Sequence, residues 1–275
     1  MALVGGLVGF VVFAWIVEKV AGLDGPIALG RPIALVMSAI PAALWLAFFY
    51  LFDRHEPEPK RLVAGVSVLG TLVAAPLADF TLQQLAPDVA LAQHGVSPFA
   101  LDRLVYAVLV VGLAQELCKY AAVRYTIYLS PEFDEPMDGV VYMMSVGTGF
   151  AVWENYHRLS GQAHQVFLST GAAQAVITTL AHASFAGVLG YVLGRAKFTR
   201  RSAPVRGILL FLGLLLAAAL NGQFQIVELW VSTSGMASEP WKGVGFAALF
   251  AVIVFGLLML ASQRLLADSP FRRDR

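Results

Sequence analysis

The chain has 275 residues, of which 58% are hydrophobic and only 13% are charged, and its mean hydropathy is +0.72. A soluble domain carries about 25% charged residues, so the composition excludes that class and indicates a polytopic membrane protein. The formal net charge of +1 argues against nucleic acid as a partner, and the single cysteine, Cys118, excludes an intrachain disulfide.

Eight apolar stretches follow one another along the chain, and about 20 helical residues are needed to cross a hydrocarbon core of about 30 Å. The first stretch lacks a basic leader and a clear small-residue cleavage site, so we expect a retained span and not a signal peptide. The connections are short and hold most of the charge, so we predict one all-α membrane domain over residues 1–275. The eight predicted transmembrane helices are residues 2–17, 32–51, 62–85, 101–123, 137–156, 166–194, 205–229 and 244–265.

The basic residues of the connections are divided unequally between the two sides of the membrane. With eight spans, thirteen of the nineteen Lys and Arg residues fall on one side and five on the other, and Lys119 falls inside a span. Cytoplasmic loops are enriched in Lys and Arg. We therefore expect both termini in the cytoplasm.

Polar residues stand inside four of the most apolar stretches, where a lipid-facing helix normally excludes them. An ionisable side chain near the bilayer centre costs about 2.5–3.5 kcal/mol on insertion scales. Such residues in separate spans are expected to face inward and to meet, so a buried intramembrane site is the first hypothesis. They are Gln115, Glu116, Lys119, Glu154, Asn155, His182 and Asn221.

In the fourth predicted span, Glu116 and Lys119 are three residues apart and share a helix face. A carboxylate held by an adjacent ammonium is ready to take a proton from water. A structural ion pair, which lets both groups survive in the membrane, has the same spacing. Cys118 points away from this face and is expected to pack.

In the fifth predicted span, Phe150 and Glu154 share a face, and Asn155 places an amide beside the carboxylate. Glu154 could stabilise a partner histidine or bind a metal, and Asn155 could donate hydrogen bonds; an interhelical clamp is the alternative. His157 completes a Glu-x-x-His pair, but the second pair and the two further glutamates of a di-iron site are absent from the sequence.

His182 is the only histidine deep in a predicted span. His182 with Glu116 and Glu154 could ligate zinc and leave one position open for water. The same groups could activate water without a metal, with His182 polarising the scissile carbonyl. In the seventh span, Asn221 and Gln225 lie one turn apart and could donate to an oxyanion or bind a neighbouring backbone.

Five segments in this order resemble the PrsW-type intramembrane proteases, which are distantly similar to the ABI/CAAX-processing proteases. The resemblance covers most of the chain, and the joint occurrence of the segments is specific. They are Asp53-Arg54-His55-Glu56-Pro57-Glu58-Pro59, Gln115-Glu116-Leu117-Cys118-Lys119, Asp138-Gly139-Val140-Val141-Tyr142, Gly147-Thr148-Gly149-Phe150-Ala151-Val152-Trp153-Glu154-Asn155, and Ala181-His182-Ala183 with Gly187 and Gly190.

The resemblance implies hydrolysis of a peptide bond in a membrane-embedded substrate, as in release of an anti-sigma factor, and a bacterial plasma membrane location. It maps the family's Glu-Glu-x-x-Lys onto Gln115, Glu116 and Lys119. The family's next motifs, Phe-x-x-x-Glu-Asn and a histidine, fall on Phe150, Glu154, Asn155 and His182.

Two positions depart from the family pattern. Gln115 replaces the first glutamate, and Asn221 replaces the usual final histidine. Glutamine cannot act as a base, and asparagine is a poor substitute for a catalytic histidine, so the departures put catalytic competence in question.

We predict an intramembrane endopeptidase acting on a single-span membrane protein. Glu116 is the expected general base, Lys119 holds its charge, and Glu154 with His182 orients water or a metal. Asn155 and Asn221 are the expected donors to the tetrahedral intermediate. The alternatives are a pseudoprotease that captures membrane helices without cleaving them and, third, a small transporter, although neither inverted repeats nor broken helices are visible in the sequence.

Overall fold

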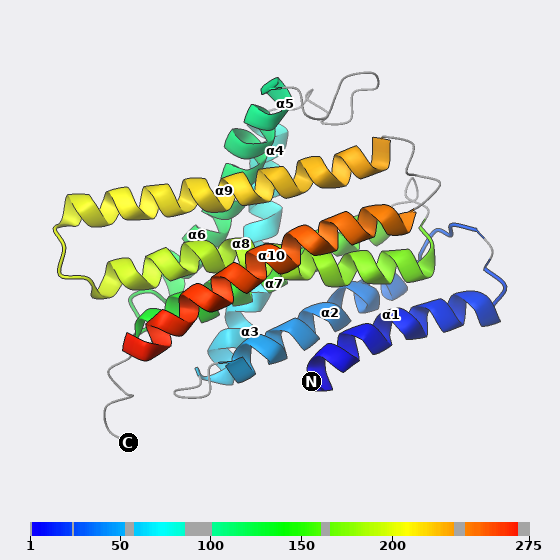
Figure 1. The fold of residues 1–275 in the computed structure, drawn as a ribbon, viewed down its shortest axis with the longest axis horizontal. Coiled ribbons are helices and arrows are strands. Elements are labelled where there is room, and N and C mark those ends of the chain that lie inside the picture. Colours follow the sequence, from blue (N-terminus) through cyan, green and yellow to red (C-terminus); the bar gives the residue numbers. More distant parts are fainter. Residues whose placement is uncertain are drawn as a thin grey trace.

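The computed structural model describes residues 2–23, 25–52, 58–85, 101–160, 166–233 and 240–268. These residues form helices joined by short connections, with one isolated bridge between Ile27 and Val166 and no strand among them, so the all-α prediction is confirmed (Figure 1). The elements are α1 (Ala2–Val20), α2 (Arg31–Phe52), α3 (Lys60–Leu69), η1 (Gly70–Ala74), α4 (Ala75–Leu85), α5 (Leu101–Tyr106), η2 (Ala107–Gly112), α6 (Leu113–Thr126), α7 (Pro136–Ser160), α8 (Leu168–Phe198), α9 (Ala203–Thr233) and α10 (Pro240–Asp268).

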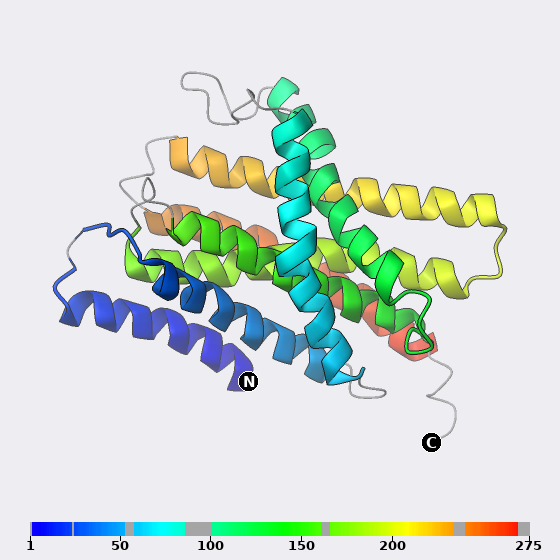
Figure 2. The same ribbon diagram turned by 180° about the vertical axis from the view of Figure 1, so that it is seen from behind.

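The helices run in two directions. Figures 1 and 2 show α1, α2 and α7–α10 lying along the long axis, while the α3–α4 and α5–α6 helices cross them steeply. Each crossing helix contains a π turn, η1 or η2, a rare element that often occurs at functional sites. Because a helix that crosses its neighbours at a steep angle meets them over only a few residues, the contact points decide which side chains face inward.

Glycine allows the closest of these crossings. A Cβ at Gly70, where η1 begins, would collide with the backbone carbonyl of Val146 on α7. One at Gly112, where η2 ends, would collide with the carbonyl of Ala218 on α9. The Gly112 contact brings the first turns of α6 directly against α9.

The α7–α8 pair forms the centre of the molecule. Most residues of both helices are buried, as expected of helices that other helices surround on all sides. Gly147, Gly190 and Gly194 lie in this seam, where an added Cβ would meet the backbone of the facing helix. Small residues allow helices to approach closely, and here they bring His182 on α8 beside α7.

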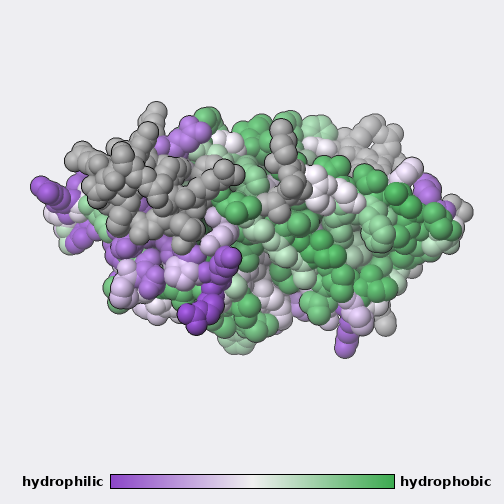
Figure 3. Space-filling model, turned by 90° about the horizontal axis from the view of Figure 1, so that it is seen from below, coloured by the Kyte–Doolittle hydropathy of each residue, from purple (hydrophilic) through white to green (hydrophobic). Residues whose placement is uncertain are grey.

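Six helices of the described chain are long and apolar enough to cross a membrane, and α1 and α7 are not among them. The six are Arg31–Leu51, Lys60–Leu85, Leu101–Thr126, Leu168–Phe198, Ala203–Ile226 and Val244–Gln263. Figure 3 shows a broad hydrophobic surface from the middle of the molecule to the right of the view, with most hydrophilic residues gathered on the left. The chain is therefore an integral membrane protein, and the count of eight spans stays a prediction.

A second group of polar side chains, which we call the Asp138 cluster, lies where α7 begins and comprises Glu58, Asp138, Tyr142 and Lys197. The hydroxyl of Tyr142 donates to the carboxylate of Glu58. Asp138 Oδ2 accepts two backbone N–H groups of the α6–α7 connection, both at 2.7 Å. Lys197 Nζ donates to two backbone carbonyls of the same connection, at 2.7 and 2.6 Å. These bonds tie the connection to the start of α7 and the end of α8, and they tie α7 to Glu58 just before α3.

Candidate active site

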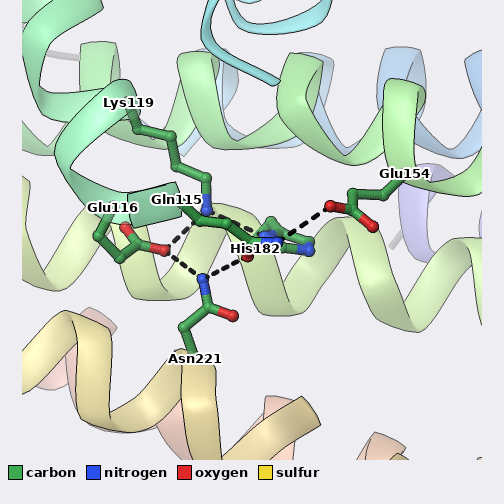
Figure 4. Close-up of polar contacts among 6 residues, drawn as sticks. All are labelled: Gln115, Glu116, Lys119, Glu154, His182 and Asn221. Atoms are coloured by element: carbon green, nitrogen blue, oxygen red, sulfur yellow. Dashed lines mark hydrogen bonds and ion pairs between the residues drawn. The ribbon is translucent and has the colours of Figure 1, made fainter. Parts of the chain in front are cut away.

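The buried polar residues of the fourth predicted span lie on α6, one turn after the π segment η2. Gln115, Glu116 and Lys119 are 3%, 0% and 0% exposed. All three point toward the seam between α6, α8 and α9 (Figure 4). Because Gly112 holds the start of α6 against α9, this face meets Asn221, which is also fully buried.

Glu116 and Lys119 form a buried ion pair. The distance from Lys119 Nζ to Glu116 Oε1 is 2.7 Å, and Asn221 Nδ2 donates to the same oxygen at 2.8 Å. The other carboxylate oxygen, Glu116 Oε2, is buried and has no hydrogen-bond partner among the described residues. One oxygen of the carboxylate is thus fixed by a cation and an amide, and the second is left to accept a proton.

His182 reaches the ion pair from α8. Its Nδ1 lies 2.9 Å from Lys119 Nζ. An ammonium can only donate, so Nδ1 accepts and the ring proton is assigned to Nε2. The Phe150 ring packs 5.2 Å from the imidazole, and Lys119 Nζ lies 4.4 Å from the centroid of the same ring. His182 therefore presents one N–H donor, and Phe150 stabilises the ammonium through a cation–π contact.

Gln115 joins the ion pair to the fifth predicted span. Its Nε2 donates to Glu154 Oε1 at 3.1 Å, and its Oε1 accepts from Asn221 Nδ2 at 3.0 Å. An ionised glutamate at this position could not donate to Glu154 and would place two carboxylates together. The amide of Gln115 therefore fits its neighbours in this chain. We call Gln115, Glu116, Lys119, Glu154, His182 and Asn221 the Glu116 cluster (Figure 4).

Asn155 is directed to a different partner. It is buried, and its Nδ2 donates to Ala175 O at 3.2 Å and to Thr179 Oγ1 at 3.4 Å, both on α8. Neither of these two acceptors belongs to the Glu116 cluster. Asn155 therefore forms an interhelical clamp, which was the alternative interpretation of its sequence position.

The other positions considered from the sequence have different surroundings. His157 is exposed near the end of α7, with its ring 4.3 Å from that of Trp153. Gln225 is partly buried one turn beyond Asn221 on α9. Cys118 is buried within the apolar core, as expected of a packing residue. His55, His94, His164 and residues 53–57 of the first family-like segment lie outside the described residues.

One intramembrane carboxylate was missed by the sequence analysis. Asp79 lies on α4 within the candidate span Lys60–Leu85 and accepts a 2.6 Å hydrogen bond from Trp153 Nε1. Trp153 is the residue before Glu154, so Asp79 fixes the part of α7 that carries a cluster residue. Its position inside the third predicted span was a signal that could have identified it.

The zinc ligands suggested by the sequence were Glu116, Glu154 and His182. Among the described residues, no three His, Cys, Asp or Glu side chains are grouped so that they could hold a metal ion. Lys119 Nζ lies within hydrogen-bond distance of both Glu116 Oε1 and His182 Nδ1. A dication on the same two ligands would face this ammonium in a medium of low dielectric constant. The arrangement does not fit zinc held by these three side chains.

Comparison with known proteins gives a consistent result. The family model described as "PrsW family intramembrane metalloprotease" matches residues 58–265. Protease PrsW of Geobacillus kaustophilus is 31% identical over 201 residues, which cover 73% of this chain and 79% of that protein. The Bacillus subtilis Protease PrsW is 27% identical over 70% of this chain and 82% of its own length. Protease PrsW of Oceanobacillus iheyensis is 30% identical over 73% of this chain and 85% of its own length. No solved structure matches significantly.

Proposed function

The chain belongs to the PrsW family of intramembrane metalloproteases, and on this premise we propose that the Glu116 cluster hydrolyses a peptide bond in or near the membrane span of its substrate. The observation that carries the proposal is the contact of Lys119 Nζ with both Glu116 Oε1 and His182 Nδ1. A carboxylate, a cation and an imidazole from two helices meet in a water-poor interior. These are the groups that activate water and stabilise an oxyanion.

Glu116 is the general base in this proposal. Its Oε2 accepts a proton from water as the water oxygen attacks the scissile carbonyl carbon. Lys119 and Asn221 hold Oε1, so they favour the ionised form of the carboxylate and keep it in one orientation. When the carbon–nitrogen bond breaks, Glu116 returns the proton to the leaving amine, and the carboxyl product and amine product balance the added water.

His182 is the donor to the tetrahedral intermediate, through Nε2–H. Asn221 was predicted to serve in this role, but both N–H bonds of its amide are used, one on Glu116 and one on Gln115. The geometry supports a positioning role for Asn221. The amide of Asn155 is likewise used on α8, and it supports the α7–α8 seam.

Glu154 acts through Gln115. It is partly buried and holds Gln115 Nε2, and Gln115 in turn accepts from the amide of Asn221 that orients Glu116. This chain of three side chains transmits the position of α7 to the base. Glu154 is therefore a positioning residue in the proposed reaction.

The proposed substrate is a single-span membrane protein, and an anti-sigma factor is the example that the family resemblance suggests. A peptide bond inside a helix is shielded from attack, so the substrate must unwind locally before cleavage. The proposed topology places both termini in the cytoplasm. Reporter fusions after Arg201 and Arg275 test it, since activity of a periplasm-dependent reporter at either point would contradict this orientation.

Because the donor set does not fit zinc, we derive no step through a metal. The purified protein is expected to hold much less than one zinc ion per chain and to keep its activity in chelators. Stoichiometric zinc that disappears in His182→Ala would overturn this expectation and assign His182 to the metal.

The experiment compares membranes from bacterial cells that express wild type, Glu116→Gln, His182→Ala or the control Cys118→Ala. New protein termini within or beside transmembrane spans are mapped by mass spectrometry. We expect them with wild type and Cys118→Ala and not with the other two variants at equal levels of folded protein. The same termini in all four samples would contradict the assignment.

A pseudoprotease is the second candidate, favoured by Gln115 and Asn221 at two positions where the family pattern has other residues. It predicts no new termini with wild type, together with recovery of intact single-span proteins bound to the purified chain. Cleavage by wild type that depends on Glu116 would exclude it.

A further inference from the structure

A hollow of about 290 Å³ lies where α8 ends and α9 begins, away from the Glu116 cluster. Both helices belong to candidate membrane spans, so this end of the pair lies at the level where hydrocarbon gives way to lipid headgroups. In Figure 1 the connection between the two helices forms one end of the molecule. The hollow is lined by Tyr191, Val192, Arg195, Thr199, Arg201 and Leu209.

The polar part of the lining is cationic and already oriented. Arg195 Nη1 donates to the hydroxyl of Tyr191 at 3.0 Å, and its guanidinium lies 5.7 Å from the centroid of that ring. This contact uses one of five N–H donors. In the described part of the chain, neither Arg195 nor Arg201 forms an ion pair with a carboxylate. Their charges are therefore available to an anion.

Lys197 is a neighbouring cation with a different role. It donates to two backbone carbonyls of the α6–α7 connection, so it is committed to the fold. The two arginines are exposed instead, with Thr199 adding a hydroxyl between them in the lining. Guanidinium groups bind phosphate through paired hydrogen bonds.

The rest of the lining is apolar and continues into the membrane. Val192 and Leu209 complete the hollow. Leu209, Leu212 and Leu216 follow at i, i+3 and i+7 on α9 and so share a face, and Leu212 and Leu216 are 55% and 52% exposed. An apolar strip therefore runs from the hollow along the outside of α9.

We propose that the hollow binds the phosphate headgroup of an anionic phospholipid, with an acyl chain along Leu212 and Leu216. Ligand pockets begin at about 300 Å³, so a hollow of about 290 Å³ takes a headgroup and leaves the chains outside. Basic pockets between transmembrane helices bind anionic headgroups in this way. A zwitterionic lipid would bring its own cation toward two guanidinium groups. The site is independent of the proposed proteolysis.

The test is native mass spectrometry of the purified full chain with equal amounts of phosphatidylglycerol and phosphatidylcholine. The variants are Arg195→Gln with Arg201→Gln, and the control Arg206→Gln. Arg206 is a basic residue of the same helix pair that does not line the hollow and whose charge acts on Tyr128 of the α6–α7 connection. Wild type should retain one phosphatidylglycerol about tenfold better than phosphatidylcholine, a preference that corresponds to about 1.4 kcal/mol.

The double variant should lose this preference, while Arg206→Gln keeps it. Equal retention of the two lipids by wild type would overturn the proposal, as would an equal loss in the control, which would indicate net charge alone. Displacement of the lipid by millimolar inorganic phosphate would also overturn it, because the hollow would then be a site for a free anion. Unchanged unfolding midpoints establish that the exposed arginines are not needed for folding.

Discussion

The Glu116 cluster and the Asp138 cluster both combine buried acids with a lysine, which is buried in the first and partly buried in the second, yet they are built from different partners. In the Asp138 cluster, Asp138 accepts backbone N–H groups and Lys197 donates to backbone carbonyls. In the Glu116 cluster, Lys119 binds two side chains, Glu116 and His182. The first arrangement fixes a connection between helices.

The second arrangement, in the Glu116 cluster, allows its side chains to take part in a reaction. Backbone groups in the Asp138 cluster fix the charge in place, because neither the donor nor the acceptor can move without unfolding the connection. An unpartnered carboxylate oxygen does not distinguish the two clusters, because Glu116 Oε2 and Asp138 Oδ1 both lack a partner in the described chain. In the Glu116 cluster, however, the carboxylate is held by the side chains of Lys119 and Asn221, and His182 lies within hydrogen-bond distance of the same lysine. Buried polarity alone does not identify a site in a membrane protein, and a carboxylate, a cation and an imidazole that meet through their side chains are the better indication.

The largest expected effect is a loss in the free energy of unfolding when the ion pair of the Glu116 cluster is broken. Glu116→Gln leaves the Lys119 ammonium buried without its counter-charge, and breaking such a pair costs about 3–5 kcal/mol. Replacing both partners, as in Glu116→Gln with Lys119→Met, should recover most of this loss. Reversible unfolding in mixed micelles measures both variants. A double variant no more stable than the single one would show that the pair is not the dominant interaction.

Tyr142→Phe examines the Asp138 cluster. The hydroxyl donates to the carboxylate of Glu58, and losing a bond to a charged group costs about 1.5–3 kcal/mol. We expect lower stability with an unchanged cleavage rate per folded molecule. A rate that falls while stability is retained would mean that this cluster also contributes to the reaction.

Gly149→Ala tests the helix contact that lies between the two clusters. An added Cβ would collide with the backbone carbonyl of Ser67 on α3, and overpacking costs about 1–3 kcal/mol. The matched control is Gly65→Ala on α3, the helix that carries Ser67, because a Cβ at Gly65 meets open space. Equal stability of the two variants would show that α3 and α7 can separate without cost.

The smallest effect, on the cleavage rate, is expected at Gln115 and Asn221, the two cluster positions that differ from the family pattern. Gln115→Glu removes the donor to Glu154 but leaves Glu116 in place, so the rate should fall by less than about tenfold, or about 1.4 kcal/mol of barrier. Cleavage that instead rises strongly in Gln115→Glu with Asn221→His would show that the natural chain is impaired. Rates at equal amounts of folded protein distinguish the two outcomes.

The sequence was sufficient for the all-α fold and for the residues that meet. Glu116, Lys119 and His182 could be identified because ionisable groups inside apolar spans are expensive, and the described contacts bring them together. These features follow from local composition and helical periodicity.

The partners of each group could not be read from the sequence. Periodicity gives the face of one helix but not its rotation against the next, and the π turns η1 and η2 shift that rotation. The sequence therefore could not decide between the two roles of Asn155, which donates to α8, and it did not indicate that both N–H bonds of Asn221 are used within the cluster. The steep crossing of α5–α6 over α9 is likewise a consequence of contacts distant in the chain (Figure 2).

The central claim is that Glu116 takes a proton from water and is more than one half of a structural ion pair. Its most direct test is the cleavage rate of Glu116→Gln with Lys119→Met, measured per folded molecule on a membrane protein that wild type cleaves. A general base contributes about 10²- to 10⁴-fold, so the account predicts a loss of that size in a protein that recovers most of the wild-type stability. A double variant that folds and cleaves at the wild-type rate would contradict it.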